Sequence, residues 1–158
     1  MVVVLIIGIL AAIALPQYTN AVNKSRAVQL YLVAKDMRQA QDRYFLQHGI
    51  YSDSFDNFDI DIPGSNIACT DGASECRKDG RYLYRIWGPS SLVQATLLSN
   101  SNNDGSGANR IITLEFYPAG YTHEKNCVTD GPDKTQARKL CLSLGGKERS
   151  DAPGYFKL

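Results

Sequence analysis

The sequence has little of what most enzymes and nucleic-acid-binding proteins need. It holds only two histidines, and no His-Glu-x-x-His, Gly-x-Ser-x-Gly or phosphate-loop pattern occurs in it. Lysine and arginine total 17 against 16 aspartates and glutamates, so the formal net charge is only +1. A dedicated nucleic-acid receptor draws its affinity from a basic excess, which is missing here. We therefore expect no catalytic residues, no cofactor, no metal site and no nucleic-acid partner.

The four cysteines, Cys69, Cys76, Cys127 and Cys141, lack the Cys-x-x-Cys spacing of zinc or haem sites. An even number of cysteines in a small chain instead indicates disulfides formed in an oxidising compartment. Three pairings are possible, and the sequence alone does not choose among them. We expect Cys69 to pair with Cys76 and Cys127 with Cys141, because each bond would pin a loop too polar to pack well. Closing a loop of about 15 residues contributes roughly 3 kcal/mol.

Charge is also missing from the N-terminal end, where no charged side chain occurs before Lys24. Residues 1–16 form an almost continuous apolar run, in which Gly8 and Pro16 are the weak points of a helix. Such a run is a cleaved secretion signal, a membrane anchor, or a helix that fills the centre of a filament. A secretion signal normally has a basic residue before the run, and a bilayer span takes about 20 apolar residues. An anchor and a filament core can be one segment used at two stages.

A helical pattern continues from Gln17 to Gln47. Apolar and aromatic residues recur there at three- and four-residue steps, which places them on one face: Ala27, Leu30, Tyr31, Ala34, Met37, Ala40, Tyr44 and Phe45. Charged and polar side chains, Arg38 among them, occupy much of the remainder, and Gly49 is a natural helix stop. One kinked helix over residues 1–47 would be about 70 Å long. A head of the remaining residues has a radius of gyration of about 13 Å, so the apolar half must protrude.

Three strands are predicted, at residues 81–87, 92–98 and 110–117, with the polar stretch 99–109 as a long hairpin loop. We interpret them as an antiparallel meander covered by the apolar helix face. Residues 50–80 and 118–158 are predicted to be irregular, with the aspartates of 53–61 in water. The fold class is therefore α+β, with a long kinked N-terminal α-helix packed on a small antiparallel sheet. The expected division is an apolar half-helix, 1–23, and a globular head, 24–158, that includes the amphipathic helix 24–48.

The first 18 residues carry a family resemblance. An apolar valine and isoleucine block leads into Ile7-Gly8-Ile9-Leu10-Ala11-Ala12-Ile13-Ala14-Leu15-Pro16, with Tyr18 after it. This string resembles the N-terminal segment of type IV pilins and of their relatives, the pseudopilins of type II secretion. More loosely, Gly49-Ile50-Tyr51 resembles the junction to the pilin head, and Cys127 with Cys141 resembles its disulfide-bounded C-terminal loop.

The resemblance implies a structural subunit of an extracellular type IV pilus filament on the bacterial cell surface, with adhesion, motility or uptake as downstream roles. The chain would polymerise with copies of itself, after a stage anchored in the inner membrane. Its further partners would be a prepilin peptidase and the inner-membrane assembly machinery. Gly8 and Pro16 would bound a stretch that loses helical order in the filament. The filament core and membrane segment would consist of Val2, Val3, Val4, Leu5, Ile6, Ile7, Ile9, Leu10, Ile13 and Leu15.

Two alternatives stay open at this point. One is a pseudopilin or minor pilin of a type II secretion or DNA-uptake system, and the other is a secreted or membrane-anchored binding domain that does not polymerise. The C-terminal cysteine pair favours a major pilin, because pseudopilins usually lack it and often carry calcium instead. In the family, an N-methylated phenylalanine and Thr-Leu-Ile-Glu-Leu precede the block with which this chain begins. We expect those six residues, and a basic leader ending in glycine, upstream of Met1.

Overall fold

The computed structural model describes residues 2–101 and 107–158 of the 158-residue chain. Its helices are α1 (Val2–His48) and α2 (Lys134–Ser143), with short 3₁₀ turns at Phe55–Asn57, Gly88–Ser90 and Gly107–Asn109. The strands are β1 (Ser65–Ile67), β2 (Glu75–Asp79), β3 (Tyr82–Trp87), β4 (Leu92–Leu98), β5 (Arg110–Phe116), β6 (Lys125–Val128), β7 (Lys147–Glu148) and β8 (Tyr155–Lys157). They form one sheet in the order β1-β2-β3-β4-β5-β6-β8-β7, and each neighbouring pair is antiparallel.

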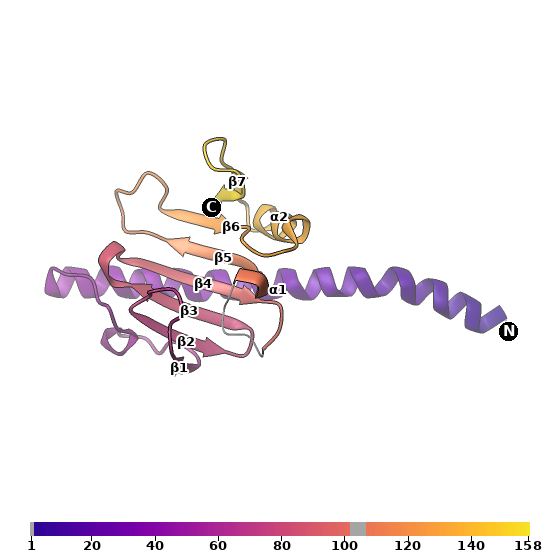
Figure 1. The fold of residues 1–158 in the computed structure, drawn as a ribbon, viewed down its shortest axis with the longest axis horizontal. Coiled ribbons are helices and arrows are strands. Elements are labelled where there is room, and N and C mark those ends of the chain that lie inside the picture. Colours follow the sequence, from indigo (N-terminus) through magenta and orange to yellow (C-terminus); the bar gives the residue numbers. More distant parts are fainter. Residues whose placement is uncertain (1, 102–106) are drawn as a thin grey trace.

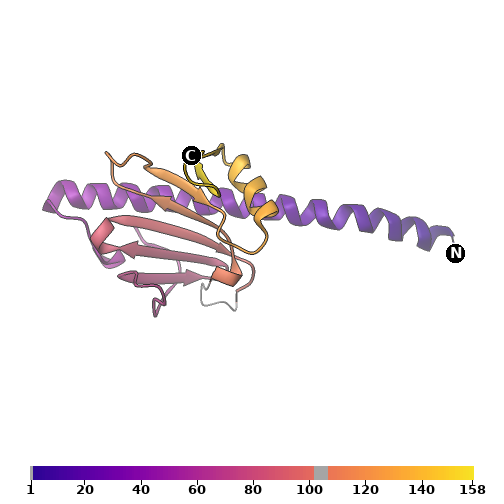
Figure 2. The same ribbon diagram turned by 45° about the horizontal axis from the view of Figure 1, so that its top comes forward.

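Helix α1 lies along one face of the sheet and then projects well beyond it toward the N-terminus (Figures 1 and 2). Its contacts with the sheet are made mainly to β4 and β5, and α2 packs beside it on β5. At 1.5 Å per residue, its 47 residues extend over about 70 Å. The helix ends where Gly49 adopts a φ of +72° and its N–H donates to the Phe45 carbonyl at 2.8 Å. This left-handed glycine cap confirms the predicted end of the helix.

The main core lies between α1 and the helix-facing side of the sheet. Leu30, Ala34 and Met37 of α1 are fully buried, and they belong to one apolar cluster with Val93 and Leu114 of the central strands. Alanines at three of the buried helix positions, Ala27, Ala34 and Ala40, carry short side chains, so the helix axis can lie close to the sheet. The predicted α+β class, with a long N-terminal helix on an antiparallel sheet, is confirmed.

The three strands predicted at 81–87, 92–98 and 110–117 correspond to β3, β4 and β5 within one residue at each end. The irregular structure predicted for 50–80 and 118–158 is wrong, because these segments contribute β1, β2, β6, α2, β7 and β8. Most of these added strands are short and pair at the two edges of the sheet, where few alternating apolar residues are needed. The long hairpin loop joins β4 to β5, but residues 102–106 of it lie outside the described residues.

The predicted polar side of α1 also needs one correction. Arg38 was placed with the solvated residues, but its side chain is 6% exposed in the whole chain. One of its Nη atoms donates to the Ser91 carbonyl at 2.6 Å and the other to an Asp42 carboxylate oxygen at 2.6 Å. Gln41 is buried beside it and exchanges two hydrogen bonds with the Ser52 backbone. Long-range partners that the local pattern does not reveal therefore draw two polar side chains into the interior.

The sheet face opposite α1 holds a buried polar network. The Arg85 guanidinium is 1% exposed, lies 3.2 Å from an Asp71 oxygen and donates to Gln94 Oε1 and Thr96 Oγ1 at 3.0 and 3.2 Å. Burial lowers the pKa of Arg85 to about 10, which still leaves it charged at neutral pH. The nearby Asp71 carboxylate opposes this shift, as expected for an ion pair. The network fastens the 68–74 loop across β3 and β4.

Two disulfides join cysteines that are neighbours in the sequence, Cys69 to Cys76 and Cys127 to Cys141. The first fastens the 68–74 loop to β2, and the second connects β6 to α2. Cys76, Cys127 and Cys141 are all buried. Each bond thus ties a segment with few apolar residues to the sheet.

Candidate functional site

The candidate site is the part of α1 that has no partner within the chain. All side chains described between Val2 and Ala21 are exposed, and burial begins at Val22 and Asn23. Val2 and Val4 are 71% and 73% exposed, and Leu15 near the other end is 65% exposed. Such a continuous apolar surface is unfavourable in water, because each buried Val, Leu or Ile side chain would contribute about 1.5–3 kcal/mol. The arrangement therefore requires an apolar environment supplied from outside the chain.

The predicted filament-core residues share this surface. The described side chains are exposed by 51–73%: Val2, Val3, Val4, Ile6, Ile7, Ile9, Leu10, Ile13 and Leu15. Leu5 lies in the same helix, but its side chain is outside the described residues. Helix α1 contains a stretch that is long and apolar enough to cross a membrane, judged by length and composition, and no part of that stretch is buried in the chain. These residues come together as one cylinder of apolar surface rather than as a pocket.

Gly8 and Pro16 both lie inside this exposed helix, which continues without a break through each of them. A Cβ atom at Gly8 would meet no atom within 4 Å, so no contact inside the chain explains this glycine. Pro16 lacks the N–H that would bond to the Ala12 carbonyl, which weakens the helix at that turn. The Thr19 hydroxyl bonds to the Leu15 and Pro16 carbonyls at 3.2 and 2.9 Å, one turn further on. The two weak points are thus intrinsic to the backbone.

The head beside this helix offers no cluster of metal-binding groups in the part of the chain that is described. No group of three or more His, Cys, Asp or Glu side chains is close enough there to hold a metal ion. Two aspartates of the acidic stretch 53–61, which the sequence predicts to lie in water, form ion pairs within the chain. Arg43 forms two hydrogen bonds with the Asp59 carboxylate at 2.5 and 2.6 Å, and Arg77 pairs with Asp56. The Arg43 guanidinium lowers the pKa of Asp59.

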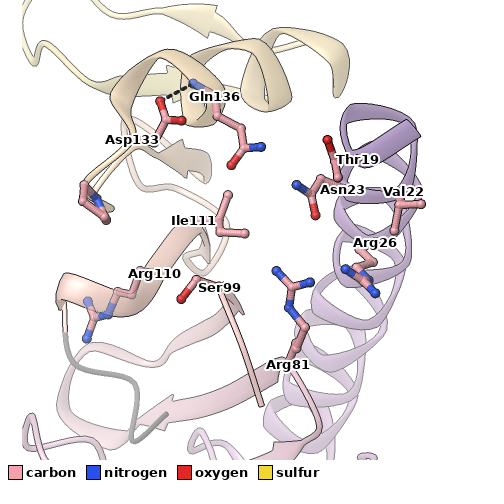
Figure 3. Close-up of a pocket in the computed structure, with 11 residues that line it drawn as sticks. Thr19, Val22, Asn23, Arg26, Arg81, Ser99, Arg110, Ile111, Asp133 and Gln136 are labelled. Atoms are coloured by element: carbon pink, nitrogen blue, oxygen red, sulfur yellow. Dashed lines mark hydrogen bonds between the residues drawn. The ribbon is translucent and has the colours of Figure 1, made fainter. Parts of the chain in front are cut away.

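One polar feature near the base of the head is not indicated by the sequence. Asn23 and Arg26 of α1 face Arg81 and Gln136 across a cavity of about 390 Å³ (Figure 3). Asn23 is 8% exposed and is buried against the head. The local sequence contains no signal for this cavity, because its walls come from α1, the β2–β3 turn, the start of β5 and α2.

Comparison with known proteins places these features in context. The chain is 29% identical over 104 residues to a type IV major pilin protein PilE1 of Neisseria gonorrhoeae, covering 66% of this chain and 56% of that protein. It is 31% identical over 108 residues to a fimbrial protein of Neisseria meningitidis serogroup A, covering 68% of this chain and 56% of that protein. The chain thus spans about half the length of the curated relatives it matches. No family model matches it, and no solved structure matches it significantly.

These relatives are a type IV major pilin protein and a fimbrial protein. The similarity extends over about two thirds of this chain, well beyond its 16-residue apolar run. The architecture agrees independently, since a long N-terminal helix lies on an antiparallel sheet whose C-terminal region is closed by a disulfide. The sequence similarity and the fold together identify the chain as a homologue of the type IV major pilins.

Proposed function

We propose that this chain is the structural subunit of an extracellular type IV pilus, and that it polymerises through the exposed half of α1. The observation that carries the proposal is the continuous apolar surface of residues 2–15, which has no partner inside the chain. Copies of this helix packed side by side would remove that surface from water. The head would then form the outer layer of the filament. The chemistry of the protein on this proposal is packing rather than catalysis.

Before assembly, the same apolar segment would hold the subunit in the inner membrane with the head outside the cytoplasm. A membrane span takes about 20 predominantly apolar residues, and α1 contains a stretch that is long and apolar enough to cross a membrane, judged by length and composition. Moving the helix from lipid into a protein core gains little free energy, because both environments are apolar. Extraction would therefore need work from an assembly machine in the inner membrane. A prepilin peptidase would act on the chain before that step.

Within this proposal, residues 1–23 act as the assembly half-helix and residues 24–158 as the head. The stretch between Gly8 and Pro16 would lose helical order in the filament and let the subunit lengthen. Its backbone is suited to this, because Pro16 removes one helical hydrogen bond and Gly8 has the largest entropy to regain. Disulfides between Cys69 and Cys76 and between Cys127 and Cys141 would keep the head folded outside the cell.

Electron microscopy of cells that produce the chain tests the proposal. Thin helical filaments that bind an antibody against the head are expected on the cell surface. A variant that carries Ile7→Asp should form none, whereas the matched variant Ile7→Leu should form them normally. Filaments absent from the wild-type cells, with the chain present and folded in the membrane, would contradict a pilus subunit. Short periplasmic assemblies in place of surface filaments would favour a pseudopilin.

A further inference from the structure

A cavity lies at the point where α1 leaves the head. Thr19, Asn23 and Arg26 of α1 form one wall, and Arg81 and Gln136 lie on the others. Figure 3 shows the guanidinium groups of Arg26 and Arg81 turned toward each other on one side of the space. The side-chain amides of Asn23 and Gln136 point into the same space (Figure 3). The cavity volume, about 390 Å³, is enough for a small polar group.

The two arginines of this cavity form a pair of like charges. Burial lowers the pKa of Arg81, and the neighbouring positive charge of Arg26 lowers that pKa further. Arg81 Nε donates to the Leu98 carbonyl at 2.8 Å, and among the described residues neither guanidinium has a carboxylate within ion-pair distance. Two cations held together without an anion are unfavourable. The positive charge on this side of the cavity therefore has no carboxylate paired with it among the described residues.

Two more charged groups line the cavity, Arg110 and Asp133, and each has a partner of its own. Arg110 lies 3.0 Å from an Asp130 oxygen and 3.3 Å from an Asp71 oxygen, and Figure 3 shows its guanidinium directed away from the space. Asp133 caps α2 by accepting from the Gln136 backbone N–H at 2.9 Å. The remaining donors, two guanidinium groups and two amides, converge on the cavity.

Asn23 is a second and independent sign of a ligand. Its side chain is 8% exposed, yet no described residue makes a hydrogen bond to its amide. The amide opens onto the cavity, so a group held in the cavity can pair with it. An oxyanion with several acceptor oxygens would satisfy this amide and both arginines at once, and a phosphate group has that chemistry.

The position of the cavity along α1 indicates where such a phosphate comes from. The apolar run ends at Leu15, and Asn23 follows about 12 Å further along the helix axis. The polar headgroup layer of a bilayer is about 5–8 Å thick on each side. Long side chains on a helix lean toward its N-terminus, which brings the Arg26 guanidinium back toward the membrane. With the apolar run of α1 in the hydrocarbon, Thr19 on the cavity wall, about 6 Å past Leu15, lies within the headgroup layer, and Asn23 lies just above it.

We propose that this cavity binds the phosphate of an anionic phospholipid headgroup while the subunit is anchored in the membrane. The proposal rests on the membrane stage of the function proposed above. The net charge of +1 gives the whole chain no general attraction to acidic lipid, so the selectivity comes from Arg26, Arg81 and Asn23. Bound lipid fixes the height and rotation of the head above the bilayer, and it must leave when the subunit is extracted.

Native mass spectrometry of the full chain in an uncharged detergent tests the proposal, with phosphatidylglycerol added as the probe. The wild-type chain should retain one lipid, and Arg26→Gln should weaken its retention about fivefold. Arg26 makes no described hydrogen bond or ion pair that its loss would break. Lys24→Gln is the matched control, because it removes the same charge from an exposed position two residues away. Arg81→Gln should act in the same direction, with circular dichroism as the check on folding.

Equal loss of lipid from Arg26→Gln and Lys24→Gln, or no loss from Arg26→Gln, would overturn the cavity as the binding site. Inorganic phosphate at millimolar concentration should leave the bound lipid in place, and displacement would refute the lipid as the source of the phosphate. Flotation of the wild-type chain with vesicles distinguishes a failure of membrane anchoring from a failure of the headgroup site. If the chain does not float, membrane anchoring and the headgroup site both fail. If the chain floats and Arg26→Gln retains as much lipid as the wild type, only the headgroup site fails.

Discussion

The two halves of α1 are one continuous helix with opposite relations to the rest of the molecule. Between Val2 and Ala21 every described side chain is exposed, although nearly all of them up to Leu15 are apolar. Between Asn23 and Gln41 the helix buries a stripe that includes Ala27, Leu30 and Met37 against the sheet. The more apolar half is thus the less buried one.

This inversion shows that the composition of a helix and its burial within one chain need not agree. In the C-terminal half the apolar residues occupy one face, so a single sheet can cover them. In the N-terminal half they occupy every face, and no single neighbour could cover such a cylinder. An environment that surrounds the helix is required, such as lipid or several copies of the same helix. Substitutions in the two halves should therefore affect different measurements.

The largest expected effect is that of a charge in the protruding half. Ile7 is 61% exposed in the chain, and an aspartate at the centre of a membrane span costs about 2.5–3.5 kcal/mol. Ile7→Asp should reduce membrane insertion roughly a hundredfold and abolish filaments. The thermal unfolding of the head should not change, because Ile7 lies outside its core. Flotation with vesicles measures insertion and circular dichroism measures unfolding. A lower unfolding temperature for the variant would show that the protruding half contributes to the stability of the head.

A substitution in the packed half should have the opposite pattern, a loss of head stability without a loss of membrane insertion. Leu30 is fully buried, and Leu→Ala in a core costs about 2–5 kcal/mol of unfolding free energy. Leu30→Ala should show this loss in urea unfolding of the head while flotation stays at the wild-type level. Leu32→Ala, at a position that is 53% exposed on the same helix, is the control and should change stability by less than about 0.5 kcal/mol. Equal losses for both variants would mean that α1 does not pack as described.

The difference between the halves also sets how far the sequence could predict this molecule. Local patterns sufficed for α1, for its end at Gly49 and for β3, β4 and β5, because each has a clear period or a strong stop signal. They failed for the edge strands and α2, which are stabilised by pairing and by the Cys127–Cys141 bond rather than by their own pattern. They also failed for Arg38 and for the Arg26–Arg81 cavity, whose partners lie more than fifty residues away.

A smaller and more local effect is expected at the proline in the protruding half. Proline inside a helix costs about 3 kcal/mol because it removes a hydrogen bond, and Pro16→Ala should restore the bond to the Ala12 carbonyl. Amide exchange of the turn around residue 16 should then slow by roughly a hundredfold in membrane-bound chain. If local melting serves assembly, the variant should also form fewer filaments. Gly8→Ala is a weaker companion change, worth about 1 kcal/mol. Unchanged exchange in Pro16→Ala would show that Pro16 is not a weak point.

The smallest expected effect is a difference in pH dependence between membrane insertion of the protruding half and the stability of the head. Residues 2–17 contain no ionisable side chain, so membrane insertion should not depend on pH through them. In the head, burial raises the pKa of the Glu115 carboxyl, and the hydrogen bond from Gln94 at 3.3 Å only partly offsets this shift. Because the folded head then binds a proton more tightly than the unfolded chain, its stability falls as pH rises from the unfolded pKa through the folded one.

Glu115→Gln removes this dependence without removing the partner of Gln94. The variant should match or exceed the wild-type unfolding free energy at pH 7, and the gap between them should narrow as the pH falls below the ordinary range of a glutamate. Urea unfolding at a series of pH values measures this, with Asp79→Asn at an exposed position as the control. If the wild-type head instead gains stability relative to Glu115→Gln as the pH rises through that window, the Glu115 carboxylate is stabilised by its surroundings. The pH dependence of the head would then come from other groups, while the protruding half would still be expected to show none.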